Sequence, residues 1–255
     1  MRKILVHIHL FKNAGTSVDQ LLRESFGGQW RSVDGPHPWS LIRADELERL
    51  IATDERLVAL SSHQVRPPLP QRAGWEIFPV VFLRHPIDRA GSVCFFERKT
   101  GFLKKEMRTA EYIRWRLSEG GPVIRNFQTA CLSTAAVGHA DQRKVRARPE
   151  HLGEAKTFLQ SLSAFGLVEK FDASMQRLVA VLGREFPQLQ LRAVRSNESR
   201  AGGIGERITE LQREIGQELS KELLEANALD MELYEFARTL FGKTGSSTII
   251  GTIEP

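Results

Sequence analysis

A lysine stands with several small and hydroxyl-bearing residues near the start of the chain, between a short apolar run and a helical pattern. These residues are Lys12, Asn13, Ala14, Gly15, Thr16 and Ser17. The free N–H groups of a first helical turn, the positive end of the helix dipole and a lysine together attract an anion. The stretch therefore predicts a loop that binds a phosphate or sulfate group, with Ser17 as the cap of the helix that follows.

A second group that could bind an anion follows a buried apolar run later in the chain. Arg84 ends this run, Pro86 favours the first turn of a helix, and Ser92 lies inside that helix. A guanidinium fork and a hydroxyl are both good donors to a phosphate. The alternative is an ordinary arginine at a strand end that pairs with a nearby acid.

A histidine stands in a third such place. His63 follows the apolar run Leu57–Leu60 and two serines. In an open parallel sheet, ligands bind beyond the carboxyl ends of the strands, so we expect Lys12, His63 and Arg84 to converge at one edge. A histidine there could act as a general base, although a lone histidine is more often structural.

The elements that position these residues follow from four apolar runs separated by helical patterns. They predict one α/β domain over residues 1–241, in three layers, with a mainly parallel central sheet flanked by helices. Residues 242–255 are expected to form a loosely ordered tail. The strand-length runs are Ile4–Leu10, Leu57–Leu60, Ile77–Leu83 and Phe165–Val168, and helical patterns begin at Ser17, Ser40, Pro86, Glu150 and Phe171.

Composition narrows the class of protein. The chain has 255 residues, a formal charge of +5 and 41% hydrophobic residues, which suits a globular domain with an anionic ligand. Cys94 and Cys131 lie in apolar helical patterns, so we expect buried thiols and neither a disulfide framework nor a zinc site. No apolar stretch approaches the roughly 20 residues that cross a bilayer.

The first loop resembles a loop of a known enzyme family. Lys12, two further residues and then Gly15-Thr16-Ser17, after a strand ending His7-Ile8-His9, resemble the 5′-phosphosulfate loop of sulfotransferases that use 3′-phosphoadenosine-5′-phosphosulfate (PAPS). The resemblance is to the carbohydrate or heparan-sulfate branch of that family. Phe11 and Asn13 depart from it, because proline and threonine are usual there.

The second loop resembles the 3′-phosphate motif of the same family. The matching residues are Arg84, Pro86, Arg89, Ser92 and Phe95. The resemblance implies a P-loop-containing fold and an enzyme that moves a sulfuryl group from PAPS to a hydroxyl acceptor, leaving adenosine 3′,5′-bisphosphate. It implies no metal, because a sulfuryl group carries less charge than a phosphoryl group.

The resemblance also assigns roles to residues. Lys12 and His63 would be catalytic, and Asn126 and Gln128 would contact the acceptor, a glycan or a small alcohol. We expect no nucleic-acid partner, no transmembrane segment and a cytoplasmic protein. The residues that would bind PAPS are Lys12, Asn13, Ala14, Gly15, Thr16, Ser17, Arg84, Ser92 and Arg200.

Two other functions stay open at this point. A P-loop kinase or nucleotide hydrolase with a degenerate loop would need a lysine directly after Gly15, where Thr16 stands. A catalytically silent protein that binds a nucleotide or a polyanion is the other alternative.

Overall fold

The centre of the molecule is a parallel sheet. A computed structural model describes residues 1–103, 106–119, 121–191 and 202–246. Four strands pair in the order β2-β3-β1-β4, and β5 pairs with β6 in the same parallel sense. The predicted α/β class with a central parallel sheet flanked by helices is confirmed. The strands are β1 (Arg2–Ile8), β2 (Trp30–Ser32), β3 (Ala59–Ser62), β4 (Trp75–Val80), β5 (Phe82–Leu83) and β6 (Gly166–Leu167).

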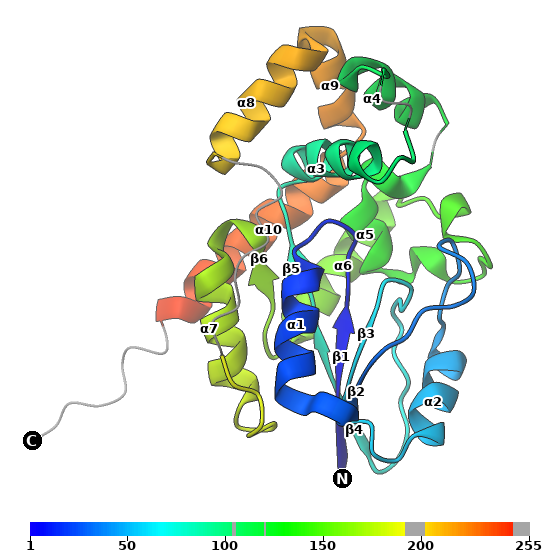
Figure 1. Cartoon of the computed structure of the whole chain (residues 1–255), viewed down its shortest axis with the longest axis vertical. Coiled ribbons are helices and arrows are strands. Elements are labelled where there is room, and N and C mark those ends of the chain that lie inside the picture. Colours follow the sequence, from blue (N-terminus) through cyan, green and yellow to red (C-terminus); the bar gives the residue numbers. More distant parts are fainter. Residues whose placement is uncertain (104–105, 120, 192–201, 247–255) are drawn as a thin grey trace, which may run out of the picture.

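Helices lie on both faces of the sheet and beyond its carboxyl edge (Figure 1). No helix in the described part of the chain combines the length and the apolar composition that crossing a membrane requires. The α-helices are α1 (Gly15–Phe26), α2 (Ala44–Thr53), α3 (Pro86–Lys99), α4 (Thr109–Ser118), α5 (Phe127–Cys131), α6 (Pro149–Ser161), α7 (Phe171–Leu182), α8 (Ile204–Ile215), α9 (Gln217–Glu225) and α10 (Ala228–Ser246).

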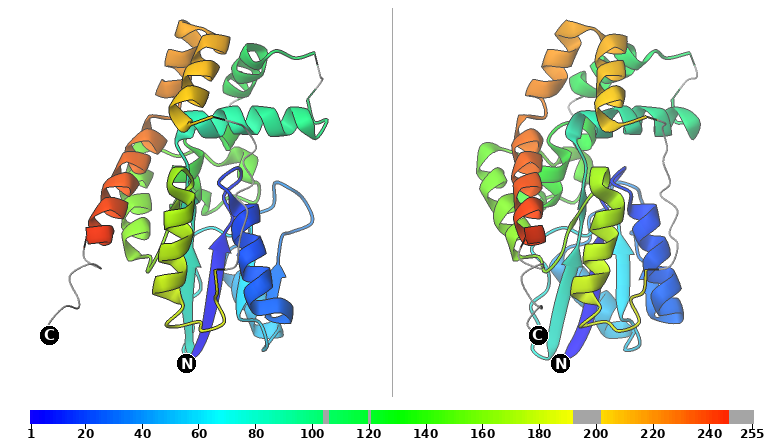
Figure 2. Two further views of the ribbon diagram at one scale, coloured as in Figure 1. Left: turned by 60° about the vertical axis from the view of Figure 1, so that its left-hand side comes forward. Right: turned by 90° about the vertical axis from the view of Figure 1, so that its left-hand side faces the viewer.

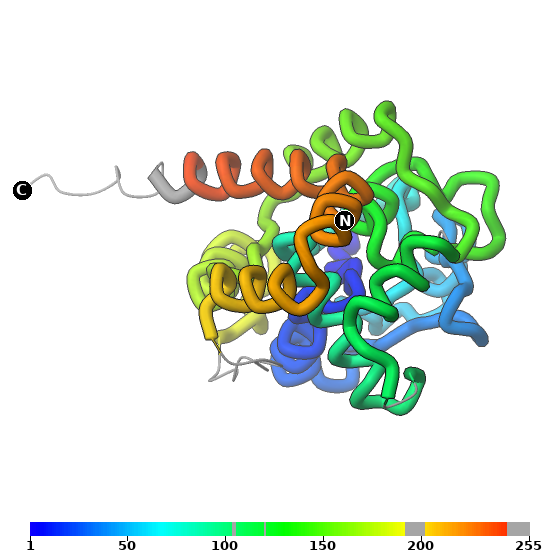
Figure 3. The backbone as a smooth tube through the Cα atoms, turned by 90° about the horizontal axis from the view of Figure 1, so that it is seen from above, coloured from blue at the N-terminus to red at the C-terminus, as the bar shows by residue number. Residues whose placement is uncertain are grey.

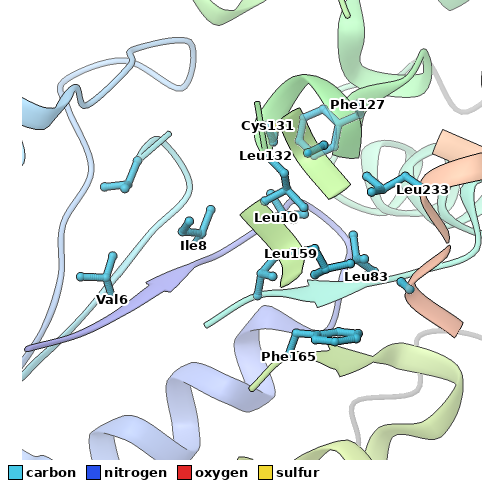
Figure 4. Close-up of a cluster of buried hydrophobic side chains, with 14 of the residues drawn as sticks. Val6, Ile8, Leu10, Leu83, Phe127, Cys131, Leu132, Leu159, Phe165 and Leu233 are labelled. Carbon is cyan, nitrogen blue, oxygen red and sulfur yellow. The ribbon is translucent and has the colours of Figure 1, made fainter. Parts of the chain in front are cut away.

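Strand β1 separates two hydrophobic cores. Its alternate residues Ile4, Val6 and Ile8 pack with side chains of α2, α5, α6 and α10. Figure 4 shows Val6 and Ile8 in this core, with Leu10 from the loop that follows. Leu5, on the opposite face, packs with α1 and α7. Because side chains alternate along a strand, His7 and His9 share the face of Leu5 and point towards α1.

Four helices form a third core above the carboxyl edge of the sheet. Helices α3, α4, α8 and α9, which we call the helical cap, contribute most of the buried side chains of this cluster. Figures 1 and 2 show α3 lying across the strand ends with the other three helices above it, and Figure 3 shows the same cap from above. The loop after β5 leads directly into α3, and the loop after β1 contacts α3 through Phe11 and Phe96.

Several predicted boundaries are wrong. Helix α1 begins at Gly15 after Ala14, and Ser17 is buried in its first turn without a capping hydrogen bond. Helix α2 begins at Ala44, not near Ser40. The run predicted as one strand divides at Val81 into β4, which pairs with β1, and β5, which pairs with β6.

The end of the chain also differs from the prediction. Helix α10 continues to Ser246, beyond residue 241 where we placed the end of the domain. Leu233, Ala237 and Phe241 are buried on the inner face of α10. This regular apolar pattern gives the helix no reason to end at residue 241. Residues 247–255 lie outside the described residues.

A reciprocal pair of helix caps joins α5 to α10. The fully buried Asp230 accepts hydrogen bonds from the N–H groups of Gln128 (3.0 Å) and Thr129 (2.7 Å) and from Oγ1 of Thr129 (2.8 Å). In return, Oδ1 of Asn126 accepts from the N–H groups of Leu229 (3.0 Å) and Asp230 (3.1 Å). Each helix thus satisfies the free N–H groups of the other.

Replacing the buried carboxylate should strongly destabilise the protein. In Asp230→Ala two buried N–H groups and a hydroxyl lose their acceptor, and we expect the free energy of unfolding to fall by about 3 to 5 kcal/mol. Urea denaturation followed by circular dichroism measures the change. Glu55→Ala, at an exposed acid in a turn, is the control and should change stability by less than about 0.5 kcal/mol. Equal stability of the two variants would contradict the capping role.

Candidate functional site

The loop between β1 and α1 has the backbone of an anion-binding nest. Lys12 (φ 65°) and Ala14 (φ 60°) both take the left-handed conformation, which is uncommon for residues other than glycine. Backbone strain of this kind is concentrated at functional sites. Within the described residues, no hydrogen bond uses the N–H groups of Ala14, Gly15 or Thr16. These groups are therefore free to bind an anion.

The side chain of Lys12 lies between this loop and α3. Its Nζ sits 4.4 Å from the ring centroid of Phe96, whose own ring meets Phe11 edge to face at 5.4 Å. Burial lowers the pKa of Lys12, and the positive charges of Arg84 and Lys99 lower it further. A binding site that already holds three neighbouring cations favours an anionic ligand.

The loop that contains Arg84 touches the first loop directly. Nη1 of Arg84 donates to the carbonyl oxygen of Lys12 (3.1 Å), and Nε donates to Oδ2 of Asp88 (2.8 Å). Arg207, from the helical cap, also donates to Asp88, at 2.8 and 2.9 Å. Burial alone would raise the pKa of the Asp88 carboxyl, but the hydrogen bonds and charges of Arg207 and Arg84 outweigh it and lower this pKa.

A buried amide joins the two loops from below. Oε1 of Gln128 accepts from Nδ2 of Asn13 (2.8 Å) and from the N–H of Arg84 (2.9 Å). Its Nε2 donates to the carbonyl oxygen of Arg84 (2.9 Å), while Asn13 also donates to the carbonyl oxygen of Phe82 (2.7 Å). Gln128 and Asn13 are both almost fully buried. The positions of the two loops are thus fixed relative to each other by paired polar groups.

An imidazole supported by a carboxylate stands at the end of the neighbouring strand β3. Nδ1 of His63 lies 3.0 Å from Oδ2 of Asp34, and the N–H of His63 donates to Oδ1 of the same residue (2.8 Å). The His63 side chain is 41% exposed. Burial would raise the pKa of Asp34, but its bonds to His63 outweigh this effect and lower the pKa. With Nδ1 donating to Asp34, Nε2 of His63 can accept a proton from a bound hydroxyl.

The ring of His63 connects to the first loop through a second histidine. The His9 and His63 rings stack with centroids 3.8 Å apart, and His9 stacks on His7 at 5.2 Å. Asp19 of α1 lies between His7 and His9, at 2.8 Å from Nδ1 of His7 and 2.9 Å from Nδ1 of His9. Ligand atoms of these three residues lie within 4.8 Å of one another, a spacing that could hold a metal ion. The carboxylate already satisfies both Nδ1 groups, so we interpret the group as a hydrogen-bonded cluster.

The structure brings together some of the predicted site residues and separates others. Lys12, the loop from Asn13 to Ser17, Arg84 and His63 meet at the carboxyl edge of the sheet, as described above. Ser92 lies on α3 between Asp88 and Phe96 at helical spacing, but it is fully buried and its Oγ has no partner in the described part of the chain. Arg200 lies outside the described residues.

The two residues predicted to contact the acceptor have other partners. Gln128 is buried and its amide is occupied by Asn13 and Arg84, so it offers no free polar group to a substrate. Asn126 caps α10 through Oδ1, while its Nδ2 makes no hydrogen bond within the described residues. The prediction that Gln128 binds the acceptor is therefore wrong, whereas the same role for Asn126 stays a prediction. Gln128 holds the two loops, and Oδ1 of Asn126 holds the start of α10.

Sequence reasoning missed the acidic partners of the site. Asp34 lies in a stretch that reads as a polar surface loop, and Asp88 and Arg207 are 119 positions apart. Only the tertiary structure pairs them with the predicted residues. The contacts of His7 and His9 with Asp19 could have been predicted from the sequence. Two histidines at alternate positions along an extended chain share one face, and that face meets the following helix.

Comparison with known proteins adds one relative. An uncharacterized protein from Archaeoglobus fulgidus is 29% identical over 248 residues, which are 92% of this chain and 95% of that protein. No model of a known protein family matches the chain. The relative is thus similar over nearly its whole length, and its description names no activity.

The histidine cluster should make folding sensitive to acid. Burial lowers the pKa of His9 to about 4, against the opposing effect of Asp19, so the unfolded chain binds more protons than the folded one between about pH 6.5 and pH 4. Stability therefore falls as pH drops through this window, by about 2 kcal/mol between pH 7 and pH 5 for one such group. Urea denaturation at the two pH values measures the loss.

A variant without the titrating ring tests the source of this loss. His9→Gln should be less sensitive to pH than the wild type by about that amount. His139→Gln removes a histidine that makes none of these contacts, and it should keep the wild-type dependence. An unchanged dependence in His9→Gln would show that the loss has another origin.

Proposed function

We propose that the chain is a PAPS-dependent sulfotransferase that acts on a hydroxyl acceptor. The observation that carries the proposal is the direct contact of two anion-binding loops, made by the Arg84 guanidinium and the Lys12 carbonyl oxygen (3.1 Å). Beside them His63 is held by Asp34 at the next strand end. A nucleotide with a phosphate at each end of its ribose requires two such loops.

The chemistry of the donor groups fits this nucleotide. The free N–H groups of Ala14, Gly15 and Thr16 with Lys12 would hold the 5′-phosphosulfate end. Arg84 would hold the 3′-phosphate, because its Nη2 makes no hydrogen bond within the described residues. The buried, unpartnered Oγ of Ser92 is a further donor near this loop, and it reaches a ligand only if covering side chains move.

The catalytic roles follow from these contacts. When bound, PAPS supplies the sulfuryl group and the phosphate that leaves. His63 takes the proton of the acceptor hydroxyl at Nε2 as the acceptor oxygen forms its bond to sulfur. Lys12 and the free N–H groups stabilise the electron pair left on the 5′-phosphate oxygen when the original sulfur–oxygen bond breaks.

The acceptor and the location belong to the same proposal. A glycan or a small alcohol would present the hydroxyl beside the half-exposed His63, and the cytosol would be the compartment. Phe11 and Asn13 are compatible with the loop's role, because Asn13 is used to bind Phe82 and Gln128 and Phe11 packs against Phe96.

Removing the loop lysine should abolish most turnover. Lys12→Ala loses one preorganised donor to the developing negative charge, so kcat should fall by about two to three orders of magnitude. The assay is transfer of label from radiolabelled PAPS to a panel of oligosaccharides and small alcohols, and the best acceptor is kept for the variants. Lys221→Ala, at an exposed lysine of α9, is the matched control and should keep the wild-type rate.

Two results would contradict the proposal. One is full turnover of Lys12→Ala with the acceptor that the wild type uses. The other is the absence of any labelled product from wild-type protein with the whole panel, together with thermal stabilisation by ATP and magnesium instead of adenosine 3′,5′-bisphosphate. That second result would favour a P-loop kinase or nucleotide hydrolase.

A further inference from the structure

His9 occupies the space between the anion-binding loop and the proposed base. A Cβ atom added to Gly15 would lie 2.0 Å from Cδ2 and 2.1 Å from Nε2 of His9, so the ring rests directly on the backbone of the loop. The opposite contact is the stack on His63, with centroids 3.8 Å apart and planes inclined by 29°. The thickness of one aromatic ring therefore sets the separation of the loop and the His63 imidazole.

The orientation of the His9 ring is fixed by Asp19 of α1. Its Nδ1 lies 2.9 Å from Asp19, and Asp19 lies 2.8 Å from Nδ1 of His7, which also contacts Oγ of Ser61 at 3.2 Å. His7 and His9 are almost fully buried, so the rings have little freedom to turn. The low pKa of His9, about 4, keeps this ring neutral near pH 7, and a neutral ring does not repel a protonated His63.

The carboxylates that face the three histidine rings also hold the rings in their stacked orientation. Asp34 faces His63 from the far side, and Asp19 faces His7 and His9 from α1. Each carboxylate bonds to Nδ1 of its histidine, which directs the corresponding Nε2 away from it. The two carboxylates thus fix the two outer ends of one aligned set of rings.

We propose that His9 is a positioning residue, which holds His63 at the distance from the Lys12 loop that in-line transfer requires. This inference rests on the proposed sulfotransferase function. It adds that Gly15 is required because only a residue without a side chain leaves room for the His9 ring. A displacement of about 1 Å in such a constellation costs about 100-fold in rate.

Four variants test the inference in the PAPS transfer assay. His9→Ala removes the ring, so kcat should fall about 10- to 100-fold while the affinity for adenosine 3′,5′-bisphosphate changes by less than about threefold. His9→Phe keeps a ring of similar size in the stack and should retain a rate within about fivefold of the wild type. Gly15→Ala displaces the His9 ring and should resemble His9→Ala. In the double variant Gly15→Ala/His9→Ala the two losses should not add, because both act through the same ring.

The outcomes separate this inference from the proposed function. A loss in His9→Phe as large as in His9→Ala overturns the positioning role, because the imidazole itself would then be required. Wild-type rates in His9→Ala overturn it as well, and so do additive losses in the double variant. If His9→Ala does not fold, His9→Phe and Gly15→Ala still decide. Wild-type protein and Lys12→Ala are measured in the same assay: active wild type with inactive Lys12→Ala supports the sulfotransferase whatever the His9 variants do.

Discussion

The candidate site depends on the buried amide of Gln128. This side chain accepts hydrogen bonds from Asn13 and from the backbone of Arg84, and it donates to the Arg84 carbonyl oxygen. The loops after β1 and β5 come from distant parts of the chain, and a single planar group with donors and acceptors sets their separation. Because every partner is buried, a loop that shifted would leave polar groups unpaired at a cost of about 1 to 3 kcal/mol each. The amide of Gln128 is itself placed by α5, which Asp230 of α10 caps. A chain of buried polar contacts thus runs from the last helix to the two loops of the candidate site.

The charge of Arg84 is partly balanced by a buried carboxylate. Asp88 receives hydrogen bonds from Arg84 at the strand end and from Arg207 in the helical cap. It holds the Arg84 guanidinium in place and neutralises part of its charge, while Lys12 rests on the face of Phe96. Because these cations are already oriented, less free energy is needed to reorganise the side chains when an anionic ligand binds. Arg207 also ties α8 to the loop of Arg84, so the helical cap and the sheet edge are linked by a charged contact as well as by packing.

The sequence predicts the frame of the molecule and only part of the site. The apolar runs around Val6, Leu60, Phe82 and Leu167 identify strands because parallel strands are buried on both faces, and the lysine and arginine at two strand ends mark the two loops of the candidate site. Ser17 misled the prediction of the helix start, since the left-handed turn at Ala14 starts α1 three residues earlier than a side-chain cap at Ser17 would. Gln128 misled it more, because a polar residue near a site is taken for a ligand-binding residue until its buried partners are known. Asp34, Asp88 and Arg207 were missed for the converse reason: their roles arise from contacts between distant segments, and no local pattern records them.

The central claim is that the two loops form one site for a nucleotide phosphorylated at both ends of the ribose. The most direct measurement compares the dissociation constants of adenosine 3′,5′-bisphosphate and adenosine 5′-monophosphate by isothermal titration calorimetry. A hydrogen bond to a charged group is worth about 1.5 to 3 kcal/mol, so contact of the 3′-phosphate with Arg84 should make the bisphosphate bind about 10- to 100-fold more tightly. Equal affinity for the two nucleotides, or tighter binding of ATP with magnesium than of either, would contradict the account.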